Sequence, residues 1–317
     1  MRNVSDDAFD EFSYLPAQAD ALGVPVPPVQ RLTHHLADGR TVSALRFGDP
    51  SLPPEATFLH GAGLNAHTWD TTVLAAGLPA LVVDLPGHGD SSWRDDARYT
   101  GATIAEDIAP AIADWALGRR QTLVGHSLGG LAAAALASRH PELVAALVLV
   151  DISPGIDPNG AAASIRAFFA GPTDWASRED LVERALSFGL GGSREAATRG
   201  VSLNSRIRPD GRVEWKHHYA HLANRLAADP DAADAVDAAQ RADAGILSAA
   251  GWDDLSAVSA PVTLVIGTRG FLTQADREEF RERMPAARHV ELDSAHNVQE
   301  ERPVELAAAL RTAHDGR

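Results

Sequence analysis

Hydrophobic residues along the chain form short continuous runs that are separated by longer helical stretches. Runs of this kind occupy residues 57–60, 80–84, 121–124, 145–150, 262–267 and 288–292. Their length suits strands, and their lack of polar alternation is typical of strands buried on both faces of a parallel sheet. An Ala-rich helical pattern at 128–139 follows the third run. This alternation predicts an α/β fold with a mostly parallel, doubly wound sheet.

The start of the chain has a different pattern. Residues 29–36 and 41–47 are extended runs on either side of Asp38-Gly39, and Asp-Gly between two such runs predicts a hairpin. Before them, residues 1–27 are acidic and then Pro-rich. This composition predicts an N-terminal extension that is partly helical or loosely ordered.

A long segment interrupts the alternation of strands and helices. From Asp151 to about Ala260 no run is typical of a strand, whereas residues 180–187 have a helical pattern. An insertion of roughly 100 residues between two core strands is typical of a lid. We therefore expect three parts, which are an N-terminal extension at 1–27, an α/β core at 28–151 and 253–317, and a helical cap at 152–252.

Composition narrows the class of protein. With 317 residues, of which 45% are hydrophobic and 22% charged, the chain is long enough to bury a sizeable core. No apolar run reaches the roughly 18 residues of a membrane-spanning helix. The N-terminus MRNVSDDAFDEF is acidic and lacks the apolar centre of a secretory signal. We therefore expect a cytoplasmic protein that has no membrane partner and is a monomer or a homodimer.

Charge and metal-ligating residues exclude further classes. The net charge of −15 disfavours nucleic acid as a partner, because phosphates are repelled by an acidic surface. The absence of cysteine excludes disulfides, thiolate catalysis and cysteine-ligated zinc. His217 and His221 have helical spacing but lack the glutamate of an H-E-x-x-H helix, so a helix surface is expected there and no metal.

The strongest chemical signal is the segment Gly125-His126-Ser127-Leu128-Gly129, which has the form G-x-S-x-G. It lies directly after a predicted strand and directly before a predicted helix. A sharp turn at that place holds the serine on a strained backbone with its hydroxyl exposed. The N-terminus of the following helix directs free N–H groups toward the site. Ser127 is therefore the candidate nucleophile.

A second segment, His60-Gly61-Ala62-Gly63, follows the 57–60 strand. Taken alone it is compatible with an ordinary Gly-rich turn. Together with the serine turn, it predicts that the backbone N–H groups of Ala62 and Leu128 form an oxyanion hole. The loop that begins at Asp84 and contains His88 follows the next strand, and we expect these two side chains to hold the loop rather than to react.

The candidate base is His296, which follows the last predicted strand in Asp293-Ser294-Ala295-His296. A loop at the carboxyl end of a strand can place its side chain over the sheet near Ser127. A hydroxyl needs a neighbouring base to become a good nucleophile, and histidine titrates near neutral pH. His296 is favoured over the other histidines by this position.

The segments FLHGAG, DLPGHGDS, GHSLGG and DSAHNVQ occur in this order and resemble those of the α/β-hydrolase superfamily over residues 32–310. The likeness is greatest to bacterial esterase-like members with a helical cap. The resemblance implies an α/β-hydrolase fold, a cap, backbone oxyanion donors, and catalytic residues in the order Ser…Asp…His.

The acid is where the sequence departs from the family pattern. Most members have an aspartate at the position of Gly270, which has no side chain to orient a histidine. Asp151 follows the 145–150 strand, where some members such as haloalkane dehalogenases and certain lactonases carry their acid. Asp151 is therefore the candidate acid, with a loop-capping role as its alternative. Asp276 is a weaker competitor, and Asp293 is too close to the histidine in sequence.

The predicted function is hydrolysis of a carboxylic ester or lactone by a Ser-His-Asp triad, without a cofactor. An apolar pocket under the cap is expected to favour a hydrophobic small-molecule substrate. The alternatives are hydrolysis of a C–C bond in a diketone and a non-catalytic ligand sensor on the same fold. Candidate residues of the pocket are Leu64, Leu128, Ile152, Phe168, Phe169 and Trp215. Core packing of the cap is the alternative role of its aromatic residues.

Overall fold

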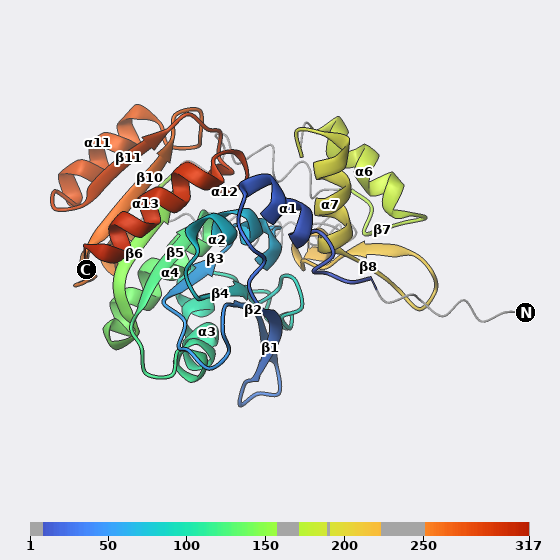
Figure 1. The fold of residues 1–317 in the computed structure, drawn as a ribbon, viewed down its shortest axis with the longest axis horizontal. Helices are drawn as coiled ribbons and strands as arrows, with labels where there is room; N and C mark the ends of the chain where they lie inside the picture. The colour runs from blue at the N-terminus through green and yellow to red at the C-terminus, as the bar shows by residue number, and fades with distance from the viewer. Residues whose placement is uncertain (1–8, 157–170, 189–190, 223–250, 317) are drawn as a thin grey trace, which may run out of the picture.

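An eight-stranded sheet forms the centre of the molecule in a computed structural model that describes residues 9–156, 171–188, 191–222 and 251–316 (Figure 1). Its strand order is β1 (Val29–His35), β2 (Thr41–Phe47), β4 (Ala80–Asp84), β3 (Ala56–Leu59), β5 (Gln121–His126), β6 (Val144–Val150), β10 (Val262–Gly267) and β11 (Arg288–Leu292). β2 pairs antiparallel with both β1 and β4, and the other pairs are parallel. The predicted mostly parallel sheet is confirmed.

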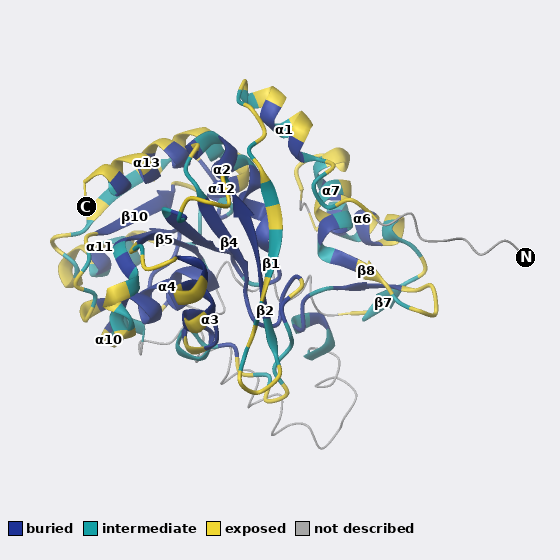
Figure 2. Cartoon of the chain, turned by 60° about the horizontal axis from the view of Figure 1, so that its bottom comes forward, coloured by how far each residue is buried: buried dark blue, intermediate teal, exposed yellow. Residues whose placement is uncertain are grey.

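Helices cover both faces of this sheet. Neighbouring residues of a strand point to opposite sides, and in the central strands the residues on both sides are apolar and need to be buried. Leu81 of β4 packs with α3 (Gly101–Trp115), α4 (Leu128–Arg139), α10 (Gly251–Ser256) and α11 (Gln274–Arg283). Val82 packs with α1 (Leu15–Leu22), α2 (Asp70–Ala76), α12 (Val298–Glu301) and α13 (Pro303–Asp315). Figure 2 shows the central strands as buried and the outer faces of the helices as exposed, whereas the edge strand β1 is intermediate to exposed. The core therefore consists of two apolar layers.

The predicted elements of the core agree closely with the structure. The bounds of β4, β10, β11 and α4 are those predicted, and β3, β5 and β6 differ by one or two residues. The predicted hairpin is formed by β1 and β2. Part of the N-terminal extension is helix α1, whose Leu15 and Ala19 are buried against the core.

The predicted cap lies between β6 and β10, and the expectation that it contains no strand is wrong. It includes α6 (Arg178–Ser187) and α7 (Arg194–Asn204) together with a three-stranded antiparallel sheet. The strands are β7 (Asp174–Trp175), β8 (Ser205–Ile207) and β9 (Val213–Trp215), in the order β7-β9-β8. These strands are only two or three residues long, so they show no hydrophobic period. In Figure 1 this segment lies to one side of the large sheet.

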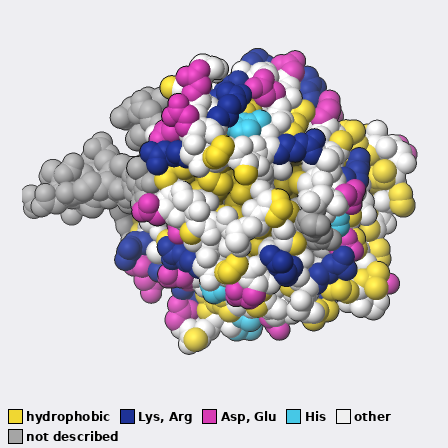
Figure 3. Space-filling view, turned by 90° about the vertical axis from the view of Figure 1, so that its left-hand side faces the viewer, with side chains coloured by type: hydrophobic (Ala, Val, Ile, Leu, Met, Phe, Trp, Pro, Cys, Tyr) yellow, Lys and Arg dark blue, Asp and Glu magenta, His cyan; other side chains and the backbone are white. Residues whose placement is uncertain are grey.

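The surface carries mixed charge. On the face drawn in Figure 3, acidic and basic side chains are interspersed rather than segregated. Among the described residues, no helix has the length and apolar character needed to cross a membrane. Two short 3-10 helices, η1 (Ala66–Trp69) and η2 (Pro141–Leu143), complete the described elements.

Candidate active site

Ser127 lies at the sharp turn between β5 and α4. Its backbone is in the left-handed region, with φ 52°, which few residues other than glycine adopt. The Ser127 N–H donates to the carbonyl of Val150 at 3.2 Å, and the Ser127 carbonyl accepts from Gly130 N–H at 2.8 Å. These contacts hold the strained turn in place, so the predicted strand–turn–helix context of the serine is present.

His296 and Asp151 contact each other although 145 residues separate them. His296 Nδ1 lies 2.7 Å from Asp151 Oδ2, and Asp151 is fully buried. An ionised carboxylate only accepts hydrogen bonds, so the contact assigns the proton to Nδ1. The carboxylate also accepts from the backbone N–H of Gly267 at 3.1 Å and of Phe271 at 2.8 Å. The predicted acid and base are therefore adjacent and rigidly held.

The other nitrogen of His296 is available for proton transfer. Nε2 is buried and has no hydrogen-bond partner within the described part of the chain. With the proton on Nδ1, Nε2 carries a lone pair. His126, the residue before Ser127, donates from Nε2 to the His296 carbonyl at 3.0 Å, and the two rings are 4.5 Å apart. His126 thus links the serine turn to the histidine loop.

The position of Gly270 explains why the usual acid is absent there. A Cβ at residue 270 would lie 2.2 Å from Asp151 Oδ2 and 2.3 Å from Oδ1. Real side chains do not approach that closely, so the Asp151 carboxylate fills the space that a side chain at 270 would need. Asp276, the weaker competitor, instead accepts from the Thr273 hydroxyl as part of the N-terminal cap of α11. Asp293 lies on the surface and pairs with Arg269.

The two predicted oxyanion donors lie on segments that meet at Ser127. Leu128 is the first residue of α4, so its N–H has no partner within the helix. Ala62 lies in a turn closed by Leu64 N–H donating to the Gly61 carbonyl at 3.2 Å. A Cβ at Gly61 would meet Ser127 Cβ at 3.2 Å and His126 Nδ1 at 2.7 Å. This close approach needs glycine and brings the Ala62 turn against the serine.

Asp84 and His60 hold the loops around the site. Asp84 Oδ1 accepts from Ala66 N–H at 2.8 Å, and its other oxygen accepts from Asp90 N–H and from Arg31. Burial alone would raise the pKa of Asp84, but the Arg31 guanidinium holds it below the ordinary value. His60 Nδ1 donates to the Gly61 carbonyl, and Nε2 accepts from Leu85 N–H. Burial lowers the pKa of His60 to about 4, so this ring is neutral and structural.

Comparison with known proteins decides the family. A sequence profile described as the alpha/beta hydrolase family matches residues 58–309, which is most of the chain. The chain belongs to the α/β-hydrolase family. It is 36% identical to the esterase Rv0045c of Mycobacterium tuberculosis, with 99% of this chain and 100% of that protein aligned. It is also 30% identical to a pimeloyl-[acyl-carrier protein] methyl ester esterase of Neisseria meningitidis, over 82% of this chain and 76% of that protein.

Solved structures agree with this assignment. The crystal structure of the Mycobacterium tuberculosis esterase superposes on this α/β hydrolase with a TM-score of 0.76 at 34% identity, covering 97% of this chain and 99% of that one. The structure of E-2-(acetamidomethylene)succinate hydrolase gives a TM-score of 0.72 at 21% identity over 90% of this chain and 100% of that one, which is a likeness of fold. Full-length similarity to an esterase supports the prediction of a hydrolase that acts on ester bonds.

The predicted pocket residues of this α/β hydrolase occupy different environments. Leu64 is half-buried in the turn beside Ser127. Ile152 is buried in the core, where its Cγ2 lies against Gly130. Trp215 is buried within the inserted segment, with its ring 6.0 Å from that of Trp175. This environment matches the alternative role of Trp215, which is packing in the core of the cap. Phe168 and Phe169 lie outside the described residues.

The expected helix surface is wrong for His217, which is buried and precedes the helical turn at 219–222, whereas His221 lies in that turn and is half-buried. His217 is fully buried with its ring stacked on Trp215, and His218 stacks on Trp93 at 4.5 Å between centroids. His218 N–H also donates to the Gly87 carbonyl of the loop after β4. The segment is therefore packed between the insertion and the core. Within the described ranges, no group of three or more histidine and acidic side chains is arranged to hold a metal ion.

Two residues near the site were not predicted from the sequence. The Phe271 ring stacks on the His296 imidazole with 3.5 Å between centroids and 6° between planes. Burial, together with the neighbouring His296, lowers the pKa of His126 well below its ordinary value, so His126 is neutral and can accept no further proton near pH 7. The only sequence signals were that His126 lies within the G-x-S-x-G segment and that Phe271 follows Gly270.

Proposed function

We propose that this chain hydrolyses carboxylic esters, including lactones, by nucleophilic attack of Ser127. His296 takes the proton of the serine hydroxyl and Asp151 orients the imidazole. The backbone N–H groups of Ala62 and Leu128 stabilise the negative oxygen of the tetrahedral intermediate. The observation that carries the proposal is the 2.7 Å contact between His296 Nδ1 and the buried Asp151 carboxylate, in a loop that His126 links to the strained turn of Ser127.

The steps follow from the protonation state of His296. Its unprotonated Nε2 accepts the proton as Ser127 Oγ bonds to the acyl carbon. The imidazolium then protonates the leaving alkoxide, and the C–O bond of the ester breaks to give an acyl-enzyme and an alcohol. A water molecule, deprotonated by the same Nε2, releases the acid and restores the serine. Asp151 stabilises the imidazolium throughout, because its carboxylate lies against Nδ1.

The relatives support the ester as the reacting group. The Mycobacterium tuberculosis protein named an esterase aligns with essentially the whole chain, and the Neisseria meningitidis protein is named a methyl ester esterase. Half-buried Leu64 beside the Ala62 turn favours an apolar group next to the reacting carbonyl. We therefore expect esters and lactones with a hydrophobic acyl or alcohol part to be better substrates than small charged esters.

Hydrolysis of p-nitrophenyl esters of increasing acyl length, together with simple lactones, tests the proposal. We expect steady turnover by the wild type and a loss of at least about 10³-fold in kcat for Ser127→Ala. Ser153→Ala is the matched control, because Ser153 is also a buried serine of the site region but has no proposed role. A fluorophosphonate should add one adduct at Ser127 of the wild type, as measured by peptide mass.

Three outcomes would contradict the proposal. Turnover that is unchanged in Ser127→Ala would show that another group is the nucleophile. A wild type that neither turns over any ester or lactone nor reacts with the fluorophosphonate would favour a ligand sensor. Reaction with the fluorophosphonate but with no ester or lactone would instead point to C–C bond hydrolysis of a diketone by the same serine.

A further inference from the structure

The end of cap helix α7 and the turn that contains Ala62 exchange hydrogen bonds. Asn204, the last residue of α7, donates from Nδ2 to the Gly63 carbonyl at 2.6 Å. In the opposite direction, Asn65 donates from Nδ2 to the Leu203 carbonyl at 3.0 Å. These residues are 141 and 138 positions apart in the sequence. The inserted segment is thus attached to the loop that carries a proposed oxyanion donor.

Each contact satisfies a backbone group that its own element leaves open. The last carbonyls of a helix have no partner within the helix, and Asn65 supplies one for Leu203. Asn65 is buried, and its Oδ1 accepts from His67 N–H at 3.0 Å, so its amide is fixed at both ends. Gly63 has φ 73° in a tight turn, where a carbonyl has few local donors, and Asn204 supplies one.

The consequence for the reaction lies in the position of Ala62. Ala62 and Gly63 are the central residues of the turn from Gly61 to Leu64. Rotation of that turn changes the direction of the Ala62 N–H, whereas the contact of Gly61 with Ser127 leaves the start of the turn fixed. The bond from Asn204 to the Gly63 carbonyl restrains this rotation. A small misplacement of an oxyanion donor has a large effect on rate, because the donor must meet the oxygen of the transition state.

Asn204 is also tied to the rest of the insertion. Its carbonyl accepts from Lys216 N–H at 2.9 Å, next to the end of β9. The Lys216 carbonyl accepts from Trp93 Nε1 at 3.0 Å, and the Lys216 ammonium pairs with Asp90 at 3.0 Å. Asn204 therefore joins α7, the small sheet and the turn that contains Ala62 at one point.

We propose that Asn204 is a positioning residue, which couples the placement of the inserted segment to the oxyanion hole by holding the Gly63 carbonyl. This inference rests on the proposed function of Ser127 and Ala62. If substrate binding shifts α7, the bond from Asn204 to Gly63 would carry that shift to the turn and change the direction of the Ala62 N–H. A contact that only fastened the insertion to the core would affect stability and substrate affinity but not the chemical step.

The test compares Asn204→Ala with Val201→Ala. Val201 is buried one turn earlier in α7, so its truncation loosens the same helix without removing the bond to Gly63. The readouts are kcat and KM with a short p-nitrophenyl ester, and the inhibition constant of an alkyl trifluoromethyl ketone, to which the serine adds to give a tetrahedral oxyanion. Thermal unfolding of each variant measures stability separately.

We expect Asn204→Ala to lower kcat by about 10-fold to 100-fold, with KM nearly unchanged. This fall in kcat should not exceed the fall caused by removing a whole oxyanion donor. The ketone should bind more weakly by a similar factor, because it also needs the oxyanion donors. Val201→Ala should lower the melting temperature but retain kcat and ketone affinity. Should Asn204→Ala fail to fold, Asn204→Asp, which keeps the side-chain shape but removes the donor, should give the same kinetic loss.

The possible results separate the inference from the proposed function. Wild-type kcat and ketone affinity in the Asn204 variants, with an inactive Ser127→Ala, would overturn the inference and leave the function standing. An equal loss in Val201→Ala and Asn204→Ala would also overturn it, because loosening of the helix would then explain both. A wild type that the ketone does not inhibit, with an active Ser127→Ala, would remove the proposed function and the inference together.

Discussion

Ser127 and Asp151 share an uncommon backbone conformation. Both have positive φ, 52° and 49°, and both follow the ends of adjacent parallel strands, β5 and β6. Such a conformation costs about 1–3 kcal/mol for a residue other than glycine and persists only where the surroundings hold it. Val150 and Val265 supply carbonyls that accept from Ser127 N–H and Asp151 N–H, respectively. The strain therefore occurs at the two positions from which the proposed nucleophile and the proposed acid project at the carboxyl ends of the strands.

Asp151→Asn should fold but lose most of its turnover. An asparagine keeps the shape but offers an N–H where His296 Nδ1 now donates, so the imidazole is driven to the opposite tautomer and its Nε2 can no longer accept a proton. We expect kcat to fall by about 10³-fold to 10⁴-fold with little change in KM. Steady-state kinetics measure this, with Asp276→Asn as the control, because Asp276 caps α11. An Asp151→Asn variant with near-wild-type kcat would exclude Asp151 as the acid.

At the residue scale, sequence reasoning found the groups with strong local context and missed those defined by packing. Ser127 became a candidate because a predicted strand, turn and helix follow one another there, and His296 because it follows the last predicted strand. Gly270 could be read only as a missing acid, since nothing in the sequence shows that the Asp151 carboxylate occupies the space beside it. Phe271 was missed for the same reason, because its stacking on His296 depends on two loops that meet in three dimensions.

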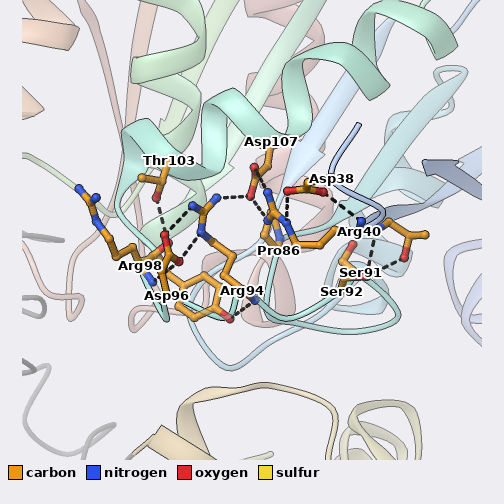
Figure 4. A network of polar contacts seen from close by, with 12 residues as sticks. Asp38, Arg40, Pro86, Ser91, Ser92, Arg94, Asp96, Arg98, Thr103 and Asp107 are labelled. Carbon is orange, nitrogen blue, oxygen red and sulfur yellow. Dashed lines mark hydrogen bonds and ion pairs between the residues drawn. The ribbon is translucent and has the colours of Figure 1, made fainter. Parts of the chain in front are cut away.

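At the scale of elements, charged side chains join the hairpin, the loop after β4 and helix α3 (Figure 4). Arg40 donates to both oxygens of Asp107, at 2.6 and 2.7 Å, and Arg94 donates to the same carboxylate at 2.7 Å. Asp107 is buried on α3, whereas Asp96, which also pairs with Arg94, is exposed. One carboxylate of α3 thus connects the preceding loop with the hairpin, whose Arg40 is 67 residues away in the sequence.

Asp107→Ala should lower the free energy of unfolding by about 1.5–3 kcal/mol, because it leaves two half-buried guanidinium groups without their buried partner. Asp96→Ala removes an exposed ion pair of Arg94 and should cost less than about 1 kcal/mol. Urea unfolding of the two variants at the same pH measures the difference. Equal effects in both variants would mean that burial of Asp107 adds nothing to the strength of its contacts.

The N-terminal extension is attached to η1 by a buried ion network. Glu11 and Asp70 lie on either side of the His67 ring, at 3.1 and 3.0 Å. Burial would lower the pKa of His67, but these carboxylates raise it to about 9. Glu11 also accepts from Arg31 at 2.9 Å, and its pKa is lowered to about 2, since His67 and Arg31 outweigh its burial. His67 is therefore charged at neutral pH, and the extension forms part of the core assembly.

His67→Gln should change the stability at alkaline pH. The folded pKa of His67 lies above its ordinary unfolded value of about 6.5, so its contribution is fully present below that value and is lost as the pH rises through about 9. We expect the wild type to lose stability between pH 7 and 9, and His67→Gln to be less stable at pH 7 but nearly flat over that interval. Urea unfolding at several pH values measures both slopes. If the free energy of unfolding falls equally in the two proteins between pH 7 and 9, groups other than His67 cause the loss of stability.

Elements of the core were predictable because continuous apolar runs distinguish buried strands from the amphipathic helices between them. The bounds of β4, β10, β11 and α4 follow directly from those runs. The strands of the insertion were not predictable, because β7, β8 and β9 are too short to show a period and depend on pairing with each other. The burial of the histidines after β9 likewise depends on how the insertion packs against the loop after β4.

At the scale of the whole molecule, the insertion has an apolar cluster that is separate from the two clusters of the large sheet. Polar and aromatic contacts connect the insertion with the part of the molecule that contains the sheet. The cluster of the insertion includes Leu181, Val201 and Trp215, separate from the two clusters of the sheet. Between the two parts lie His217 and the loop after β4, which contains His88. A junction of this kind can change with conditions that leave the apolar clusters intact, since its contacts depend on neutral imidazole rings.

The molecule should therefore lose stability in mild acid. Burial lowers the pKa of His60 to about 4, and it lowers that of His88 well below the ordinary value, with the nearby His60 and His217 adding to the shift. Burial, with His221 and His218, lowers the pKa of His217 to about 3. These folded values lie below the unfolded value of about 6.5, so the unfolded chain binds more protons, and each histidine removes up to about 1.4 kcal/mol per pH unit below that value. His67, with its raised pKa, is protonated in both states there and does not offset the loss.

Urea unfolding of the wild type at pH 7, 6 and 5 measures how the free energy of unfolding changes in mild acid. Calorimetry in buffers of different ionisation enthalpy measures the protons taken up on unfolding. We expect the free energy of unfolding to fall progressively, with net proton uptake at pH 5.5. His217→Phe keeps an aromatic ring against Trp215 but cannot bind a proton, so its decline should be shallower than that of the wild type. A free energy of unfolding that stays constant from pH 7 to 5, with no proton uptake, would mean that these rings are already charged or solvated in the folded protein. A decline that is equal in both proteins would remove His217 from the set and leave the other buried neutral histidines, such as His60, His88 and His126, as its source.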